Sequence, residues 1–595
     1  MYKCMQFNHG EFSSQSTLDT RQSSLTMITS YIAGLIICLA WATASAVEVT
    51  TSLGAIRGSI LKSRLGKDFY SFRGIRYANS PVNEFRFKQA QPVSPWKPKV
   101  FDATEDGPMC PQIPFNSTDY SEDCLRLNVY SRNLDEKALK PVIIYLHPGG
   151  FYAVSGQSKY FSGPQLIMDR DDIVFVTINF RLGTLGFLAL GTSDAPGNAG
   201  LKDQVLAFKW VRDHIRKFGG DPNSVTLVGY SAGSFSIGLH MASPMSKGLF
   251  HRGITMSASP VSQYRYPNEQ VDLAKRQAEL VNCPTSNINA MVQCLRKTPA
   301  EEFVRTHYDM FDFGWSPVLN WMPVIEKEFG QDRFIIEEPL DSFQHGRIQR
   351  IPLIVGMTKD EFVGIGHDVM KNESMLQQMN NEWDRLAPIC FLYERNTPRS
   401  REISAVLKKE YLDNKPLKSG ESFEPLGKLF SDGLIAFAVH RFAHLAARYV
   451  PVHYYKFAYK GRYSHFNYPA DEQKPYGTAH HDDLIYLLHI PVLAPLFKKT
   501  DPEDTTIERL TRMWTQFAKT GDPNNPNDEY LKNLNWTQFS LKKENYLEIG
   551  NELVMKEGLF LERFRIWKKL FPLKWDDKPC KRGRNQSPDY PEPIE

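Results

Sequence analysis

The sequence has no long stretch of one charge and almost no net charge. Its 595 residues include 71 Lys and Arg against 67 Asp and Glu, which gives a formal net charge of +4. The basic cluster Lys578–Arg584 is short and lies near the end of the chain. Because proteins that bind nucleic acid carry a concentrated basic surface, we expect no nucleic-acid partner. The chain also has no internal repeats, which argues against a repeat array.

Long apolar stretches are missing too, apart from one short run near the start. Ile32–Trp41 is compact and apolar, and residues 44–46 (Ala-Ser-Ala) have the small side chains of a signal-peptide cleavage site. We expect a leader over residues 1–46 that is removed before Val47, with Met27 as an alternative start. The run is short for a membrane span, and no apolar segment ends the chain. We therefore expect a secreted protein without a membrane anchor.

Cysteine is scarce, with eight residues, and Cys4 and Cys38 would leave with the leader. The six that remain are Cys110, Cys124, Cys283, Cys294, Cys390 and Cys580. The first two close a short loop and so do the next two, but spacing alone does not fix their connectivity. Cysteines in this number fit an oxidising compartment.

Glycosylation sequons also fit secretion. They start at Asn116, Asn372 and Asn535. Asn585 begins a poorer one, because Pro588 follows its serine.

The most informative motif is Gly229-Tyr230-Ser231-Ala232-Gly233. The apolar, β-branched stretch Val225–Val228 precedes it, and Phe235–Met241 can continue as a helix. In this position between strand and helix, Gly-x-Ser-x-Gly forms a tight turn, the nucleophile elbow, which exposes its serine at the top of a sheet. The pattern arises easily by chance, so its meaning depends on partners elsewhere in the chain.

A nucleophilic serine needs a histidine to take its proton and an acid to orient that histidine. In proteins with a nucleophile elbow, the acid follows a later strand of the same sheet, and the histidine comes after the acid in the chain. Ile351–Gly356 indicates such a strand, and Asp360 and Glu361 follow it as alternatives. The best region for the base contains His480 and His481, which their chemistry does not separate.

Acyl transfer also needs donors for the negative oxygen that forms on the carbonyl. The strand-like stretch Val142–Leu146 ends in His147-Pro148-Gly149-Gly150-Phe151. Consecutive glycines let backbone N–H groups face a ligand without obstruction. We predict an oxyanion loop here, which acts together with the N–H of Ala232.

Together these residues resemble the type-B carboxylesterase/cholinesterase family of α/β-hydrolases, and within it the secreted insect carboxylesterases. Other motifs that resemble the family are Ser121–Tyr130, Asn179–Gly183, Gly197–Gln204 and Phe218–Pro222. In the first of these, Arg126 stands where an aromatic residue or Thr is usual.

The resemblance implies a role for each site residue. It implies Ser231 as nucleophile, Glu361 as acid and His480 as base. Its other implied site residues are the oxyanion donors Gly149, Gly150 and Ala232, and Ser257 as a hydroxyl that supports Glu361. The family usually has a third glycine where this chain has Pro148, but the donors are the next two residues, so the change should be tolerated. The implied disulfides are Cys110–Cys124 and Cys283–Cys294.

The expected fold is that of an α/β-hydrolase, in one domain over residues 47–575. From Val142 onward, strand patterns alternate with helical ones, which indicates a large, mainly parallel sheet with flanking helices. Residues 47–77 predict an antiparallel hairpin before it. Residues 268–424 are rich in helix formers and should form a helical cap over the active-site mouth.

The end of the domain is also marked in the sequence. Leu561–Leu570 predicts a helix that Pro572 stops, because proline cannot continue helical hydrogen bonding. Residues 576–595 are rich in proline and should be a disordered tail.

We therefore predict a secreted serine carboxylesterase that acts on small-molecule esters through an acyl-enzyme, without metal or cofactor. One alternative is a non-catalytic adhesion protein of the same fold, although such relatives lose a member of the triad. Another is a lipase or a hormone esterase, although hormone esterases usually carry Gln at the position of Tyr230.

The resemblance also bears on the charge of the substrate. Cholinesterases place an aromatic platform for the cation ten residues before the signature cysteine, and an acid before the nucleophile. Here those positions hold Pro114, with Phe115 adjacent, and Tyr230. We expect uncharged esters to be preferred over choline esters.

Overall fold

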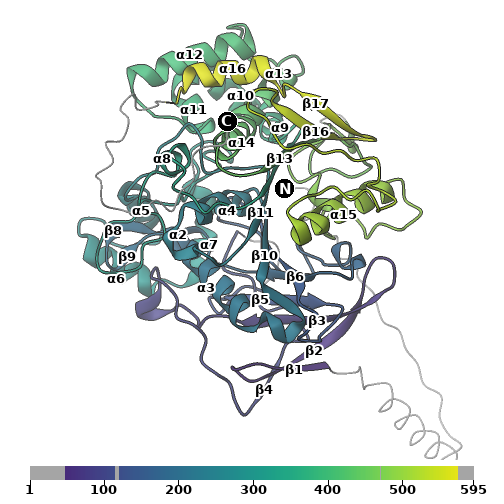
Figure 1. Cartoon of the computed structure of the whole chain (residues 1–595). Helices are drawn as coiled ribbons and strands as arrows, with labels where there is room; N and C mark the ends of the chain where they lie inside the picture. The colour runs from purple at the N-terminus through teal and green to yellow at the C-terminus, as the bar shows by residue number, and fades with distance from the viewer. Residues whose placement is uncertain (1–46, 114–118, 469–470, 574–595) are drawn as a thin grey trace, which may run out of the picture.

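The computed structural model describes residues 47–113, 119–468 and 471–573 of the chain. The predicted leader and tail, the sequons at Asn116 and Asn585, Cys580, Pro114 and Phe115 lie outside the described residues. A large mixed sheet runs through the molecule, with helices packed around it (Figure 1).

Within the described residues, the sheet has 13 strands in the order β1-β2-β3-β5-β7-β6-β10-β11-β12-β13-β16-β17, with β4 paired to β2. The strands are β1 (Val47–Thr50), β2 (Ala55–Lys62), β3 (Asp68–Arg76), β4 (Val100–Asp102), β5 (Arg126–Ser131), β6 (Lys140–Leu146), β7 (Val174–Ile178), β10 (Gly220–Tyr230), β11 (Arg252–Met256), β12 (Leu353–Thr358), β13 (Val452–Phe457), β16 (Asn545–Ile549) and β17 (Leu553–Glu557). The run from β7 to β16 is parallel, as predicted. The predicted antiparallel pairing at the start of the chain is present in β1, β2 and β3.

The parallel strands are buried, apolar segments whose ends are aligned. All residues of β7 and β12 are buried, and so are the residues of β11 from Gly253 onward. This burial is expected for strands covered by helices on both sides. In the register, Gly229 lies beside Leu146, Tyr230 beside Met256, and Met256 beside Gly356. The loops that follow β6, β10, β11 and β12 therefore leave the sheet at one edge, which gathers the predicted site residues there.

Helices surround the sheet and fill the region between β11 and β13. The α-helices are α2 (Gly183–Phe187), α3 (Ala199–His214), α4 (Ala232–Ala242), α5 (Val271–Leu280), α6 (Ile288–Lys297), α7 (Ala300–Arg305), α8 (Pro339–Gln344), α9 (Val363–Lys371), α10 (Glu373–Asn381), α11 (Trp383–Cys390), α12 (Pro398–Leu412), α13 (Phe423–Ser431), α14 (Phe437–Ala446), α15 (Asp504–Thr520) and α16 (Leu561–Leu570). The predicted helix-rich region corresponds to α5 through the start of α13. Helix α16 has the predicted bounds, and Pro572 follows it.

The structure contains both disulfides that the resemblance implied. Cys110 and Cys124 are joined with an S–S distance of 2.04 Å, and Cys283 and Cys294 with 1.99 Å. Closing loops of this size stabilises a protein by roughly 3 kcal/mol. Among the described cysteines, Cys390 is not part of a disulfide, and it lies fully buried.

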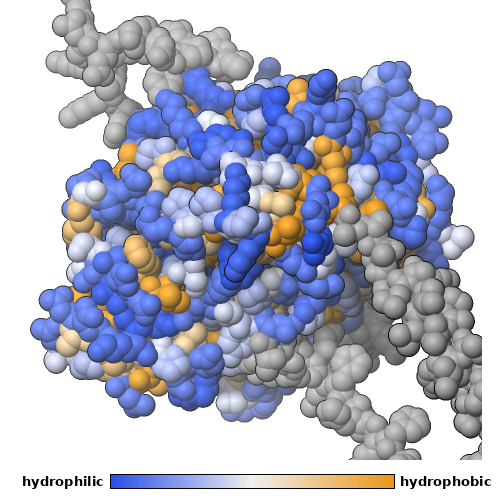
Figure 2. All heavy atoms as spheres, turned by 90° about the horizontal axis from the view of Figure 1, so that it is seen from below, coloured by the Kyte–Doolittle hydropathy of each residue, from blue (hydrophilic) through white to orange (hydrophobic). Residues whose placement is uncertain are grey.

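No helix within the described ranges is long and apolar enough to cross a membrane. The face shown in Figure 2 is largely hydrophilic, with apolar side chains in small patches.

Candidate active site

The Gly-x-Ser-x-Gly motif forms a tight turn between strand β10 and helix α4. β10 ends at Tyr230 and α4 begins at Ala232, so Ser231 alone makes the turn, with φ 51° and ψ −117°. This backbone conformation is strained for a residue with a side chain. The Ser231 amide donates a hydrogen bond to the Met256 carbonyl at 2.8 Å, which ties the turn to β11. The geometry is that of a nucleophile elbow.

Both glycines of the motif are required by close backbone contacts. A Cβ atom at Gly229 would lie 2.4 Å from the carbonyl carbon and oxygen of Gly233. A Cβ at Gly233 would lie 2.0 Å from the carbonyl oxygen of Leu146, at the end of β6. Strand, helix and neighbouring strand thus approach each other too closely for any side chain.

We expect Gly233→Ala to lower the free energy of unfolding by about 2–5 kcal/mol, because the new methyl group overlaps rigid backbone. Denaturant unfolding measures this change. Gly550→Ala is the matched control, because its Cβ would meet only the Glu552 carbonyl oxygen at 3.7 Å. The crowding argument fails if both variants are equally stable.

Glu361 and His480 meet through a hydrogen bond, although 119 residues separate them. His480 Nδ1 lies 2.5 Å from Glu361 Oε2. The other carboxylate oxygen, Oε1, accepts a hydrogen bond from the Thr358 amide at 2.8 Å. Both side chains are buried: the exposed fraction is 1% for His480 and 0% for Glu361. His480 Nε2 has no hydrogen-bond partner among the described residues, so it is free to interact with a reacting group.

The neighbouring candidates, Asp360 and His481, have different contacts. Asp360 Oδ2 accepts a hydrogen bond from the Thr478 amide at 3.1 Å, and the Asp360 amide donates to the Thr478 carbonyl at 2.9 Å. Asp360 therefore joins the loop after β12, which carries Glu361, to the loop that carries His480. The His481 ring makes no hydrogen bond to a carboxylate in the described chain. The geometry places Glu361 and His480 together, as the resemblance implied.

Burial acts on both members of this pair. It raises the pKa of Glu361 to about 7, against the opposing effect of the nearby Ser257 hydroxyl and of the hydrogen bond from the Thr358 amide. It lowers the pKa of His480 to about 3. Both shifts favour the uncharged forms, because a low-dielectric site disfavours charge.

The loop after β6 lies beside the elbow. Gly149 has φ 107° and Gly150 has φ 59°, conformations that glycine adopts without strain. A Cβ at Gly149 would lie 2.0 Å from the Ala153 carbonyl oxygen, so the loop folds tightly on itself. In the part of the chain that the structure describes, no hydrogen bond uses the amides of Gly149, Gly150 or Ala232 as donors. These three residues and Ser231 line one cavity.

Ser257 follows β11 and is fully buried beside the acid. Its φ of 57° is unusual for a residue with a side chain. The Ser257 Oγ has no hydrogen-bond partner by distance and angle within the described residues. It nevertheless lies near enough to Glu361 to favour the charged carboxylate and lower its pKa.

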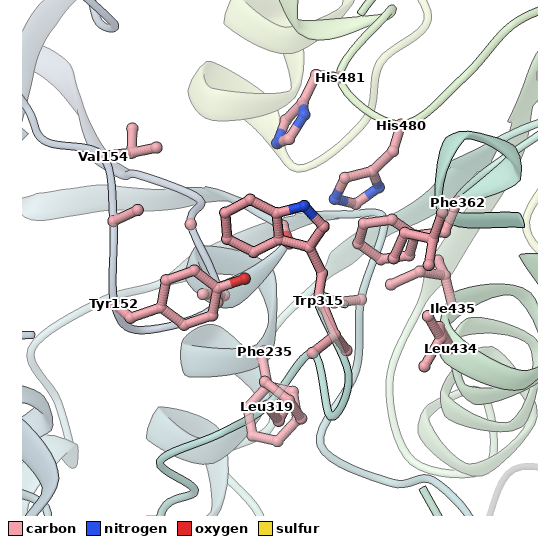
Figure 3. Close-up of a pocket in the computed structure, with 18 of the residues that line it drawn as sticks. Tyr152, Val154, Phe235, Trp315, Leu319, Phe362, Leu434, Ile435, His480 and His481 are labelled. Atoms are coloured by element: carbon pink, nitrogen blue, oxygen red, sulfur yellow. The ribbon is translucent and has the colours of Figure 1, made fainter. Parts of the chain in front are cut away.

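The cavity at the elbow is mainly apolar. It encloses about 1050 Å³, including the part that opens to solvent. Apolar residues that line it include Val154, Phe235, Trp315, Leu319, Phe362, Leu434 and Ile435, and most of them come from the helix-rich region between β11 and β13 (Figure 3). Asp368 also lines it. An apolar cavity with a few polar groups is typical of a site for a small molecule.

Sequence reasoning missed the residues that hold the histidine loop in place. The Tyr230 hydroxyl accepts a hydrogen bond from the His481 amide at 2.8 Å, so the elbow itself supports the loop. Asp482 is buried and accepts hydrogen bonds from the amides of Ala479 at 2.7 Å and His465 at 2.9 Å. The sequence signal for Asp482 was its position directly after His481, which did not distinguish it from a surface acid.

The chain is similar to characterised esterases over most of its length. A family model described as "Carboxylesterase family" matches residues 45–567. The juvenile hormone esterase of Tribolium castaneum is 33% identical over 527 residues, which cover 85% of this chain and 88% of that protein. Esterase FE4 of Myzus persicae is 34% identical over 496 residues, which cover 81% of this chain and 86% of that protein.

A solved structure agrees with these matches. The crystal structure of juvenile hormone esterase from Manduca sexta, with OTFP covalently attached, superposes with a TM-score of 0.77 at 26% sequence identity. The superposition covers 89% of this chain and 100% of the Manduca sexta chain. The chain therefore belongs to the carboxylesterase family, with the α/β-hydrolase fold, and is a hydrolase of carboxylic esters.

Proposed function

We propose that the protein is a secreted serine carboxylesterase that hydrolyses uncharged esters through a covalent acyl-enzyme. The observation that carries the proposal is the 2.5 Å hydrogen bond between Glu361 and Nδ1 of His480, which lines the same cavity as Ser231. A buried acid that orients a histidine beside a strained serine is the arrangement that activates a serine nucleophile.

In the first step, Ser231 Oγ attacks the ester carbonyl carbon while its proton passes to His480 Nε2. Glu361 holds the imidazole through Nδ1 and stabilises the positive charge that forms on it. The amides of Gly149, Gly150 and Ala232 donate to the carbonyl oxygen as it becomes negative. The bond to the alcohol oxygen then breaks, and that oxygen takes the proton from His480.

In the second step, water replaces the alcohol. His480 takes a proton from the water, whose oxygen attacks the acyl carbon, and the bond to Ser231 Oγ breaks as the serine regains a proton. The products are the carboxylic acid and the free enzyme. Ser257 supports Glu361 by favouring its ionised form.

An organophosphonate that mimics the tetrahedral carbon tests the proposal. It should bind one equivalent per chain, and peptide mapping should find it on Ser231. A non-catalytic adhesion protein would take up none at this residue. Ser231 and His480 line one cavity and Glu361 is hydrogen-bonded to His480, which favours the enzyme over that alternative.

Secretion is supported by the two disulfides, which form in oxidising compartments. Asn372 and Asn535 are both exposed, as glycan acceptors must be. Two of the similar proteins named above are juvenile hormone esterases, so a hormone ester belongs in any substrate panel. Tyr230 occupies the position where such esterases usually have Gln, which favours a general carboxylesterase.

We expect kcat/KM for a neutral ester to rise with pH through an apparent pKa near 7. One proton added to the Glu361–His480 pair inactivates it, because His480 must be neutral and Glu361 must be ionised to accept from Nδ1. Burial lowers the pKa of His480 but raises that of Glu361 to about 7, so the carboxyl takes the proton first as pH falls. A profile measured from pH 4 to 9 checks this. If kcat/KM falls only below about pH 5, the imidazole of His480 alone titrates and the prediction is wrong.

We expect a neutral alkyl ester to be hydrolysed at least about tenfold faster, by kcat/KM, than butyrylthiocholine of the same acyl length. A quaternary ammonium is bound by aromatic faces and a nearby charge. Tyr230 replaces the acid before the nucleophile, and its fully buried ring lies beside His480 instead of facing a ligand. Among the described cavity residues Asp368 is the carboxylate, and burial raises its pKa. The prediction is contradicted if the wild-type protein hydrolyses butyrylthiocholine as fast as the neutral ester and the Asp368→Asn variant loses this choline-ester activity.

A further inference from the structure

Two more histidines lie beside the proposed base. His465 and His481 both line the cavity that contains His480. The ring centres of His480 and His481 are 4.3 Å apart, and those of His465 and His481 are 4.9 Å apart. Figure 3 shows His480 and His481 side by side at the cavity, with Phe235 and Leu319 at the opposite side of the view. One part of the wall of this mainly apolar cavity is therefore made of imidazoles.

These imidazoles have ring nitrogens without partners. Both nitrogens of His481 and Nδ1 of His465 are buried and make no hydrogen bond within the described residues. Burial lowers the pKa of each ring well below its ordinary value, so both are neutral. A neutral imidazole has one N–H donor and one acceptor nitrogen. A buried ring nitrogen without a partner is costly, so a bound water molecule or a ligand is expected to pair with these atoms.

The backbone holds His481 in this position at a cost. Its φ of 82° lies in the left-handed region, which few residues with a side chain adopt. The hydrogen bond from its amide to the Tyr230 hydroxyl fixes that conformation. Asp482 binds the amides of Ala479 and His465, so both histidine segments are fixed to one carboxylate. Strained residues held in this way are found at ligand sites.

We propose that His465 and His481 form a polar subsite that binds a hydroxyl group of the substrate, so that the preferred esters carry a hydroxyl within a few bonds of the ester carbonyl. The inference rests on the proposed function, because it places this hydroxyl beside the ester that Ser231 attacks. A hydroxyl group donates one hydrogen bond and accepts another, which matches the donor and the acceptor of neutral imidazoles. A carbonyl or ether oxygen would satisfy donors alone, and a cation would find no charge on these rings.

Matched ester pairs, in which a hydroxyl replaces a methyl of similar size, test the subsite. On the alcohol side the pair is 2-hydroxyethyl butanoate and propyl butanoate. On the acyl side it is ethyl 3-hydroxybutanoate and ethyl 3-methylbutanoate. We expect the wild-type protein to prefer the hydroxy ester of one pair by about tenfold in kcat/KM, and that pair shows which side of the ester faces the histidines.

The variants separate recognition from packing. His481→Phe keeps a ring but removes both nitrogens, and should reduce the preference about tenfold while kcat/KM for the methyl partner stays within about threefold. His481→Asn tolerates positive φ and keeps a donor and an acceptor, so it should retain most of the preference. His465→Phe should lower the preference in the same pair. Phosphonate titration counts the competent sites in each preparation, so loss of folded protein is not read as loss of recognition.

The subsite is ruled out if the wild-type protein has no preference in either pair. It is also ruled out if His481→Phe keeps the preference or slows both partners equally. These outcomes leave the proposed function intact, because the methyl esters are still hydrolysed and Ser231 still takes up phosphonate. Failure of the wild-type protein to hydrolyse any of the four esters, together with no phosphonate on Ser231, would overturn both.

Discussion

Ser231→Ala should lower kcat for a neutral ester by at least about 10⁴-fold and leave the fold intact. Without Oγ no acyl-enzyme can form, and the remaining oxyanion donors supply only residual catalysis. The side chain is small and 9% exposed in the cavity wall, so its loss removes little packing. Steady-state kinetics on an alkyl ester, with circular dichroism and a melting curve, measure both parts of the prediction.

A second serine in the same helix provides the control. Ser236 lies in α4, where its Oγ donates to the Ala232 carbonyl at 2.8 Å and does not line the cavity. Ser236→Ala should keep activity within about tenfold and cost about 1 kcal/mol of stability. If Ser231→Ala folds and retains near-normal turnover, the nucleophile is elsewhere.

His480→Ala should reduce kcat by at least about 10³-fold, whereas His481→Ala should keep kcat for a neutral alkyl ester within about tenfold. Only His480 is oriented by Glu361, through the 2.5 Å hydrogen bond to Nδ1, with Nε2 left free. The His481 ring has no carboxylate to orient it among the described residues. The two variants differ by one position in the same loop, so general damage to the loop should affect both alike.

Kinetics on propyl butanoate, with phosphonate titration of each variant, measure this difference. His480→Ala should also react slowly with the phosphonate, because Ser231 has lost its base. The reverse pattern, with His481→Ala inactive and His480→Ala active, would move the base to His481 and remove Glu361 from its role.

Local patterns in the sequence predicted the elements that carry the site. The apolar stretch before Gly229 and the helix formers after Gly233 predicted a strand, a turn and a helix, and the turn at Ser231 has that form. Such patterns are readable because they depend on neighbours a few residues apart. The helix Leu561–Leu570 was predicted for the same reason, from its composition and the proline after it.

The choice between adjacent residues of one chemistry required more than local patterns. Asp360 and Glu361 are both acids, and His480 and His481 are both imidazoles, so only the resemblance favoured one of each. The direction of each side chain depends on how two loops meet 119 residues apart, where Asp360 accepts a hydrogen bond from the Thr478 amide and Glu361 is hydrogen-bonded to His480. No periodicity in the sequence records that meeting.

The amino-acid sequence by itself thus determined the elbow, its flanking elements and the residue types able to act as acid and base. Tertiary structure alone decided which acid and which histidine are hydrogen-bonded to each other, and it added Tyr230 and Asp482 as supports that no motif predicted. The reason is physical. Secondary structure follows from local backbone preferences, whereas a hydrogen bond of 2.5 Å between buried groups requires the whole sheet to align the ends of its strands.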